Sequence, residues 1–285
     1  MVGEIKVRKP GLYTTVQDMG RFGFRAYGVP VSGVMDTTSA RMAQALVGNT
    51  EEEALLEITL RGPELYFGCT TLIAMTGANL SPQIDGKPVE MYQPYAITPG
   101  QVLSFGKPIN GCRTYLAVKG GFQVEKVMDS FSWYQPVTPQ SKLEKGDVID
   151  VIETTYPHKP SHARVAPADF FQIQVEVFPG PEYDQLSKPV QQELISRHFH
   201  ISNQAGRMGY RLKETLEHYQ PQKDLLTSVV LPGTVQLTSG GGLIVLMRDC
   251  QTTGGYPRVL QLTKPAIDIL AQKKPGDRVR FCWPG

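Results

Sequence analysis

Near its start the chain reads Gly20-Arg21-Phe22-Gly23-Phe24-Arg25, and its second half repeats this pattern as Gly206-Arg207-Met208-Gly209-Tyr210-Arg211. A second pair follows in the same order, because Pro99–Pro108 is echoed by Pro275–Pro284. Two short matches can arise by chance, but the shared order favours an internal duplication. Prolines cluster between residues 155 and 168. The sequence therefore predicts two related β domains, one over 1–160 and one over 161–285.

Short apolar runs separated by glycine and proline indicate that the chain is mainly β. The sequence holds 28 Gly and 22 Pro, spread along 285 residues. Asp85-Gly86 predicts a hairpin turn, because both central residues of a type I′ turn need positive φ. The pattern is typical of sandwiches and barrels. The expected strands are Leu55–Leu60, Thr71–Met75, Val102–Phe105, Arg113–Val118, Val148–Ile152, Phe171–Phe178, Leu243–Met247 and Val279–Phe281.

Helices are expected to be few and short. The first covers Thr37–Val47, with Asp36 placed to cap its N-terminus. The second lies within Tyr183–Arg197, where Pro189 is expected to interrupt it. The third covers Pro265–Gln272 and has a proline in its first turn.

Composition excludes several classes of protein. The net charge is only +2 and no basic cluster is present, so neither nucleic acid nor an anionic membrane is expected as a partner. No run approaches 18 apolar residues, and the N-terminus lacks the apolar core of a signal peptide. The four cysteines form no C-x-x-C pair and have no histidine at zinc spacing. We expect a cytoplasmic protein with free thiols and no metal site.

The most specific stretch reads Thr15-Val-Gln-Asp-Met-Gly-Arg-Phe-Gly23 and continues as Gly28-Val-Pro-Val-Ser-Gly-Val-Met-Asp36. It resembles the N-terminal signature of the allophanate hydrolase subunit 2 family of biotin-dependent carboxyltransferases. That family includes the C-type subunit of 5-oxoprolinase, the sporulation-control protein KipA and part of the carboxyltransferase region of urea carboxylases. Further stretches agree, so the resemblance runs from residue 14 to residue 281. They are Arg113–Gly121, Gly206–Leu212, Gln251–Pro257 and Pro275–Phe281.

The resemblance implies a cyclophilin-like β-barrel architecture and a partner similar to KipI or to the B-type subunit of 5-oxoprolinase. The A-type subunit of that enzyme is a possible third member. Such complexes open the amide of 5-oxoproline to give L-glutamate, so ATP with Mg²⁺ is the expected cofactor. Two alternatives stay open on this scaffold: a KipA-like regulatory protein that sequesters a KipI-type inhibitor, and the carboxyltransferase half of a urea-carboxylase-like system. The chain has no P-loop and no lysine in an Ala-Met-Lys-Met context, so it carries no covalent biotin.

In the N-terminal half, Asp18 and Asp36 are the candidate catalytic residues. Arg21 and Arg25 suit a carboxylate or a phosphate, because guanidinium is a planar fork of donors. Ser32 and the first N–H groups of the following helix form a candidate anion-binding corner. Structural alternatives stay open, because Asp18 can accept hydrogen bonds from its own turn or pair with an arginine, and Asp36 can be a helix cap alone.

In the C-terminal half, the candidate substrate-binding residues lie in two glycine-rich segments. These segments combine hydroxyl and amide side chains with glycines, whose backbone adopts conformations closed to other residues. They are Arg207, Arg211, Gln251, Thr252, Thr253, Gly254, Gly255 and Tyr256. The backbone N–H groups of the two glycines can serve as oxyanion donors. The two arginines are equally suited to bind an anion or to pair with Asp249. We expect the candidates of both halves to surround one concave surface.

Segment 129–143 departs from the family pattern. Relatives have Gly-Ser-Arg-Ser-Thr where this chain reads Asp129-Ser-Phe-Ser-Trp133, and the glycine-rich stretch that follows is missing. We expect the isolated chain to be inactive, because a half-site built from turns gains its low dielectric when a partner closes over it. Exposed aromatic residues among Phe131, Trp133 and Tyr134 are expected in that interface; the alternative is that they fill a shortened loop.

Overall fold

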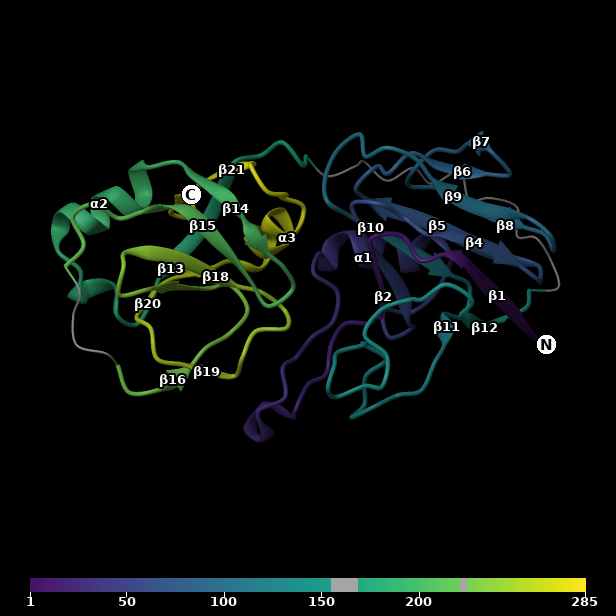
Figure 1. Ribbon diagram of the computed structural model, residues 1–285, viewed down its shortest axis with the longest axis horizontal. Helices are drawn as coiled ribbons and strands as arrows, with labels where there is room; N and C mark the ends of the chain where they lie inside the picture. The colour runs from purple at the N-terminus through teal and green to yellow at the C-terminus, as the bar shows by residue number, and fades with distance from the viewer. Residues whose placement is uncertain (155–168, 221–224) are drawn as a thin grey trace. The chain divides into compact units, whose positions relative to one another are not determined.

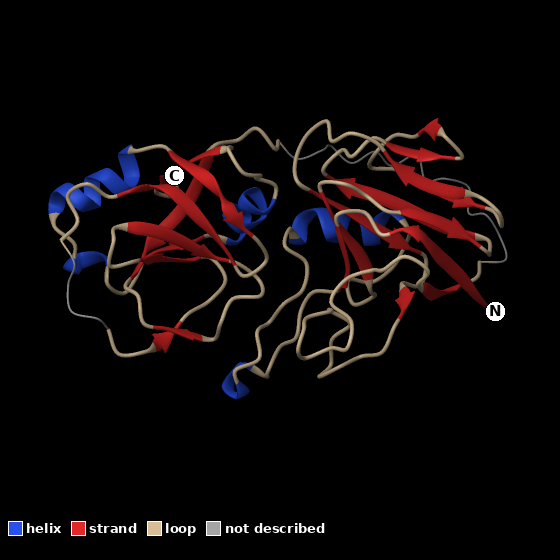
Figure 2. Cartoon of the chain, in the orientation of Figure 1, coloured by secondary structure: helices blue, strands red, loops and turns tan. Residues whose placement is uncertain are grey.

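The computed structural model describes residues 1–154, 169–220 and 225–285 and divides into two compact units (Figure 1). Unit 1 comprises Met1–Phe22 and Ser32–Phe170, whereas unit 2 comprises Gly23–Val31 and Phe171–Gly285. Strands predominate in both, as predicted (Figure 2). The expected junction at residue 160 lies outside the described residues. The short segment Gly23–Val31, although flanked on both sides by unit 1, belongs to unit 2.

Unit 1 is a sandwich of two antiparallel sheets, with strand orders β11-β12-β1-β4-β9-β6-β7 and β2-β3-β10-β5-β8. Both sheets contribute to one apolar core, which includes Ile5 and Leu65 from the first sheet and Leu56 and Leu116 from the second. The strands are β1 (Val2–Lys9), β2 (Tyr13–Gln17), β3 (Leu55–Thr59), β4 (Glu64–Phe67), β5 (Thr71–Gly77), β6 (Pro82–Ile84), β7 (Lys87–Pro88), β8 (Pro94–Ile97), β9 (Val102–Phe105), β10 (Arg113–Val118), β11 (Phe122–Gln123) and β12 (Val148–Ile152).

Helix α1 (Thr37–Leu46) covers the outer face of the second sheet, packing against β5 and β10. This explains why both strands are buried along their whole length. Side chains alternate between the two faces of a strand, so Leu116 enters the sandwich core whereas Tyr115 packs against the helix. Asp36 caps the helix, as predicted, by accepting a 2.9 Å hydrogen bond from Ser39 N.

The predicted hairpin turn at Asp85-Gly86 joins β6 and β7. Their φ values are 52° and 75°, as a type I′ turn requires. This prediction is therefore confirmed.

Unit 2 is a closed barrel with strand order β13-β20-β17-β18-β15-β14-β21, which confirms the predicted barrel. Large apolar side chains such as Phe199, Tyr210, Val245 and Phe281 are buried. Two further short strands, β16 (Ser228–Val229) and β19 (Thr253–Gly254), pair with each other. The barrel strands are β13 (Gln174–Pro179), β14 (Phe199–Ala205), β15 (Gly209–Thr215), β17 (Thr234–Leu237), β18 (Gly242–Leu246), β20 (Arg258–Leu262) and β21 (Arg278–Cys282).

Two helices pack on this barrel. Helix α2 (Lys188–Ser196) packs against β21, and α3 (Lys264–Ala271) packs against β13. Pro189 does not interrupt α2, as the sequence suggested, but occupies its first turn. The N–H that proline lacks has no intrahelical partner at that position, so the residue is tolerated there.

The two copies of the repeated motif lie in different local structures. Arg21 follows β2 in a loop, and this first copy is divided between the two units after Phe22. Arg207 lies in the turn between β14 and β15. The expected equivalence of the two copies is therefore wrong at the level of secondary structure, although both arginines are buried.

Candidate functional site

A pocket of about 420 Å³ lies on the outer face of the barrel in unit 2. Its floor is a row of cross-strand neighbours, in which Ile244 on β18 pairs with Gln236 on β17 and with Arg211 on β15. Residues directly opposite each other share one face of a sheet. Their chain neighbours Val235 and Tyr210 are fully buried. The row therefore faces away from the barrel interior.

Segment 250–256 (Cys250–Tyr256) covers this row. Gln251, Gly254, Gly255 and Tyr256 line the pocket from this segment. The Nε2 atom of Gln251 donates to Oε1 of Gln236 over 3.4 Å. Gln236 is only 1% exposed, and its Nε2 has no hydrogen-bond partner in the described structure. The pocket thus contains a buried amide donor that no described protein group satisfies.

A buried ion pair anchors the start of this segment. Arg207 donates from Nε to Oδ2 of Asp249 over 2.7 Å and from Nη2 to Oδ1 over 3.0 Å. The backbone N–H of Asp249 returns a 2.9 Å hydrogen bond to the carbonyl of Arg207. Of the two alternatives left open by the sequence, Arg207 therefore pairs with Asp249. This pairing positions the segment, and a substrate-binding role for Arg207 stays a prediction.

Arg25 also contacts this segment and its neighbour Val230. Its Nη2 donates to the carbonyl oxygens of Val230 and Thr252, the latter over 3.3 Å. The Thr252 carbonyl also accepts from Val230 N over 3.1 Å, and Thr253 pairs with Val229. Neither threonine lines the pocket. Arg25, Thr252 and Thr253, predicted to bind substrate, thus make contacts that order the segment.

The pocket combines one cation with several amides. Arg211 is the only charged side chain among the described residues that line it, and three carboxamides surround it. Tyr256 adds a phenol that is 40% exposed. The lining contains no carboxylate, imidazole or thiol, so the described residues can bind and orient a small anionic amide but offer no general base. The described lining residues are Gln204, Met208, Gly209, Arg211, Gln236, Ile244, Leu246, Gln251, Gly254, Gly255 and Tyr256.

Sequence reasoning missed Gln204 and Gln236. The first lies near the end of β14 and the second within β17. One signal was available for the second residue. Gln236 is polar between Val235 and Leu237, which are buried strand residues.

Asp18 in unit 1 is buried and hydrogen-bonded on both carboxylate oxygens. Its Oδ1 accepts from Gly20 N and from the hydroxyls of Ser130 and Ser132, at 2.6–2.8 Å. Its Oδ2 accepts from the backbone N–H of Phe131 over 2.6 Å. Arg21 donates to the Ser132 carbonyl over 2.8 Å. Both residues therefore fasten segment 127–132, and the catalytic role of Asp18 stays a prediction.

Asp36 belongs to a second buried network, behind the N-terminus of α1. Its backbone N–H donates over 2.8 Å to the hydroxyl of Tyr115, which donates to Glu57 over 3.0 Å. Arg113 lies 3.5 Å from the same carboxylate. Burial, with the nearby carboxylates, raises the pKa of Tyr115 well above its ordinary value. The Asp36 carboxylate itself accepts from Ser39 N and Ser39 Oγ, as a helix cap does, and its catalytic role stays a prediction.

The expected anion-binding corner is not open in this structure. Ser32 is 1% exposed, and its hydroxyl has no hydrogen-bond partner among the described residues. Asp36 already caps the helix that follows. Of the N-terminal candidates, Arg25 belongs to unit 2 with the Gln251 segment, whereas Asp18, Arg21, Ser32 and Asp36 belong to unit 1. The single concave surface expected around all of them stays a prediction.

Residues 27–283 match the family model described as carboxyltransferase domain, subdomain A and B. The chain belongs to this family. It is 34% identical over 281 residues to the C-type subunit of 5-oxoprolinase from Escherichia coli (strain K12), covering 97% of this chain and 90% of that protein. It is 32% identical to the Haemophilus influenzae protein of the same name, covering 94% and 87%. The family resemblance inferred from the sequence is thereby confirmed.

Larger proteins contain the same domain. The chain is 29% identical to urea amidolyase of Saccharomyces cerevisiae, covering 97% of this chain but 16% of that protein. The crystal structure of TTHA0988 superposes with a TM-score of 0.89 at 29% identity, covering 98% of this chain and 55% of that one. The chain therefore spans about half of that solved protein. The Kluyveromyces lactis urea amidolyase structure gives a TM-score of 0.85 at 26% identity, over 99% of this chain and 19% of that one.

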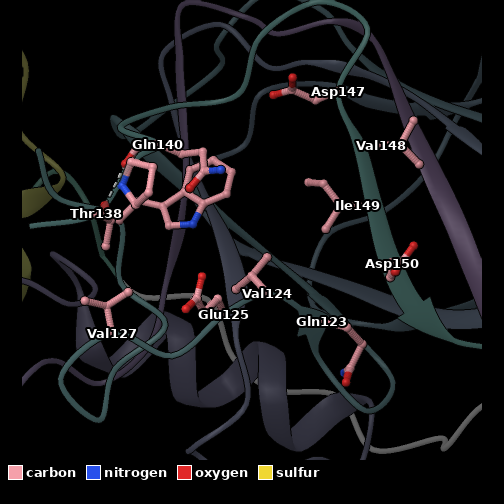
Figure 3. Close-up of a pocket in the computed structure, with 12 residues that line it drawn as sticks. Gln123, Val124, Glu125, Val127, Thr138, Gln140, Asp147, Val148, Ile149 and Asp150 are labelled. Atoms are coloured by element: carbon pink, nitrogen blue, oxygen red, sulfur yellow. Dashed lines mark hydrogen bonds between the residues drawn. The ribbon is translucent and has the colours of Figure 1, made fainter.

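A different kind of pocket lies beside the segment that departs from the family pattern. This pocket of about 330 Å³ in unit 1 is lined by Glu125, Asp147 and Asp150 together with Trp133 (Figure 3). Its described lining contains no lysine, arginine or histidine. A carboxylate substrate would be repelled there. The barrel pocket is therefore the better candidate for an anionic ligand.

The aromatic residues of that segment do not form an exposed patch. Trp133 is 8% exposed and belongs to the sandwich core, and its backbone N–H donates to the carbonyl of Val16 over 3.0 Å. Phe131 packs against the same core, with Lys126 Nζ 4.8 Å from the centre of its ring. The expectation that these aromatics provide an exposed interface is wrong for Trp133. The alternative, that they fill a shortened loop, describes this structure.

Within the described residues, no group of three or more His, Cys, Asp or Glu side chains is placed to hold a metal ion. No described helix is long and apolar enough to cross a membrane. The four cysteines are free, and three of them are buried. Burial raises the pKa of the Cys250 thiol to about 11, so this residue packs at the start of segment 250–256 as a neutral thiol.

Proposed function

We propose that the chain is the C-type subunit of an ATP-dependent 5-oxoprolinase, an enzyme that opens 5-oxoproline to L-glutamate. One observation carries this proposal: the barrel pocket surrounds the cation Arg211 with three carboxamides and has no acidic residue in its described lining. 5-Oxoproline has one carboxylate and one lactam. Arg211 would pair with the carboxylate through its planar fork of donors. The amides of Gln236 and Gln251 would donate to the lactam oxygen and accept from its N–H.

The same pocket supports a requirement for a partner. Ring opening by water needs a base or an activated acyl species, and the described lining offers neither. We propose that a protein similar to KipI or to the B-type subunit of 5-oxoprolinase completes the site, with the A-type subunit of that enzyme as a further member. When bound, ATP with Mg²⁺ would supply the phosphoryl group that activates the lactam oxygen, with ADP as the leaving group and phosphate released when water opens the ring. Exclusion of water by the partner would strengthen the pairing between Arg211 and the substrate.

A second candidate function is carboxyl transfer. The observation in its favour is that 97% of the chain aligns with urea amidolyase of Saccharomyces cerevisiae. Urea presents a carbonyl and two N–H₂ groups, which the carboxamides of the pocket can also bind. Urea has no carboxylate, however, so this function leaves Arg211 to pair with the carboxylate carried on biotin.

The deciding experiment co-expresses the chain with proteins similar to the A-type and B-type subunits and measures glutamate and phosphate released from 5-oxoproline and ATP. We expect turnover by the complex and negligible turnover by the chain alone. Arg211→Ala should raise KM at least tenfold. Arg278→Ala is the matched control, because this exposed arginine lies on β21 and does not line the pocket. Urea-dependent consumption of carboxybiotin without glutamate release would favour carboxyl transfer, and full activity of the Arg211 variant would overturn the assignment of the pocket.

A further inference from the structure

A separate groove of about 600 Å³ lies on unit 2 beside helix α2 and strand β21. Five of its lining residues come from α2 at positions i, i+3, i+4, i+7 and i+8, so they share one face of the helix. Arg280 on β21 and the residues Tyr183 and Trp283 complete the described lining. It shares no residue with the pocket around Arg211. The residues on α2 are Lys188, Gln191, Gln192, Ile195 and Ser196.

The groove has an aromatic wall. Trp283 and Tyr183 meet edge to face, with ring centroids 5.6 Å apart and an interplanar angle of 86°. This contact fixes the indole, yet 40% of Trp283 remains exposed. A large apolar surface that is fixed in orientation and open to solvent is suited to stack against a planar ring.

The groove also has two cations and no acid in its described lining. Arg280 makes no ion pair with any described residue, and its buried Nε has no hydrogen-bond partner there. Lys188 lies in the first turn of α2, where the helix dipole adds positive potential. The Lys188 Nζ contacts only a neutral group among the described residues, Oε1 of Gln191, at 3.1 Å. An anion placed here would meet two cationic groups that no described acid neutralises.

We propose that this groove binds a nucleoside polyphosphate. The base would stack on Trp283, the phosphates would lie against Lys188 and Arg280, and the carboxamide of Gln192 would contact polar atoms of the base. The volume lies within the range of roughly 300–1,000 Å³ that holds small ligands. The inference rests on the proposed function in one respect, because it places the nucleotide of that reaction on this chain. The binding itself can be measured without the reaction.

The first test titrates the full-length chain with ATP and follows tryptophan fluorescence. We expect saturable quenching that Trp283→Phe abolishes. Lys188→Ala and Arg280→Ala should each weaken binding at least tenfold. Lys213→Ala is the matched control, because this exposed lysine lies on β15 away from the groove. Adenosine should bind more weakly than ATP. Inorganic tripolyphosphate should compete with ATP without quenching.

The second test uses the complex with its partner. Photo-crosslinking with 8-azido-ATP, followed by peptide mapping, should label the peptide that contains Trp283. Arg280→Ala should abolish this label. A label confined to a different protein of the complex, or one that Arg280→Ala leaves unchanged, would overturn the nucleotide site even if the complex still cleaves 5-oxoproline. Labelling of the groove in a complex that releases no glutamate would instead uphold the site and refute the proposed reaction.

Discussion

Gly254 lies directly against the carboxamide of Gln236: a Cβ at position 254 would come within 2.5 Å of Gln236 Nε2. Real Cβ atoms essentially never approach a neighbour so closely. The atom it would meet is the end of the Gln236 side chain, so an alanine at 254 would require this buried carboxamide to move; no positive φ is recorded for Gly254. It brings segment 250–256 onto the one buried amide of the pocket.

Gly254→Ala should displace the Gln236 carboxamide and so disrupt the pocket. We expect at least a tenfold loss of kcat/KM for 5-oxoproline in the assembled complex, because misplaced binding groups lose orientation. Steady-state kinetics measures this. Gly240→Ala is the control, because a Cβ there meets nothing within 4 Å. Equal kcat/KM values for Gly254→Ala and Gly240→Ala would show that the contact between Gly254 and Gln236 is irrelevant to activity.

Breaking the pair between Arg207 and Asp249 should destabilise unit 2. Their side chains are 6% and 7% exposed, so Asp249→Asn leaves a buried guanidinium without its counter-charge. We expect a loss of about 3–5 kcal/mol in the free energy of unfolding, measured by urea denaturation. Lys274→Ala removes a half-exposed cation paired with Asp277 at 3.3 Å and should cost less than about 1 kcal/mol. Similar losses in the two variants would contradict this account.

Unit 2 should lose stability in acid. Burial alone would raise the pKa of Glu182, but hydrogen bonds from Arg258 outweigh burial and hold this pKa below its ordinary value of 4.5. A carboxyl group with a depressed folded-state pKa contributes its full stability above the unfolded pKa. That contribution is lost as the pH falls through the folded pKa, because the unfolded state binds the proton first.

Urea unfolding of the full chain between about pH 6 and pH 3 checks this prediction. We expect Glu182→Gln to be less stable than the parent chain at neutral pH and to show a shallower loss of stability below pH 4.5. Glu217→Gln is the control, because the side chain of Glu217 is 70% exposed. If Glu182→Gln showed the same pH dependence as the parent chain, the depressed pKa would have no effect on stability.

Replacing Trp133 should lower the stability of unit 1, because this residue belongs to its core and not to an exposed interface. Trp133→Ala removes a core side chain of unit 1 and should cost about 3–5 kcal/mol, visible as a lowered melting temperature of the isolated chain. Trp133→Phe should lower the melting temperature less than Trp133→Ala does. Phe22→Ala, at a residue that is 66% exposed, should change stability by less than about 0.5 kcal/mol. A Trp133→Ala protein that keeps its melting temperature but no longer co-purifies with a partner would restore an interface role.

The strands were predictable wherever local pattern and burial agree. The run Arg113–Val118 is buried along its whole length as β10, and its apolar stretch Tyr115–Val118 indicates such burial. Asp85-Gly86 was predictable because the turn needs residues that tolerate positive φ. Pro189 was misjudged, because the helix start lies later than the sequence pattern suggested. Assignment of Gly23–Val31 to unit 2 depends on tertiary contacts, such as those of Arg25, that no local pattern encodes.

The candidate site was predictable in part. Arg211 and the residues Gln251, Gly254, Gly255 and Tyr256 meet at one pocket, since polar groups in glycine-rich turns are typical of binding sites. Gln236 could not be predicted as a pocket residue, because it lies in an ordinary strand. It lines the pocket only because segment 250–256, distant in the sequence, covers it. Whether Asp18 is catalytic or structural could not be decided from the sequence. Its bond from Gly20 in the same turn was foreseeable, but its other donors, in segment 130–132, lie more than 100 positions away.

The assignment of residues 23–31 to the barrel unit has a consequence for biosynthesis. These residues leave the ribosome early, yet the groups that Arg25 binds, the carbonyls of Val230 and Thr252, emerge about 200 residues later. The nascent chain must therefore hold this segment out of the first unit until the second is nearly complete. A cut at the junction between the halves would separate Arg25 from its acceptors, so a barrel unit expressed without residues 23–31 would lack the contacts that order segment 250–256 from Arg25.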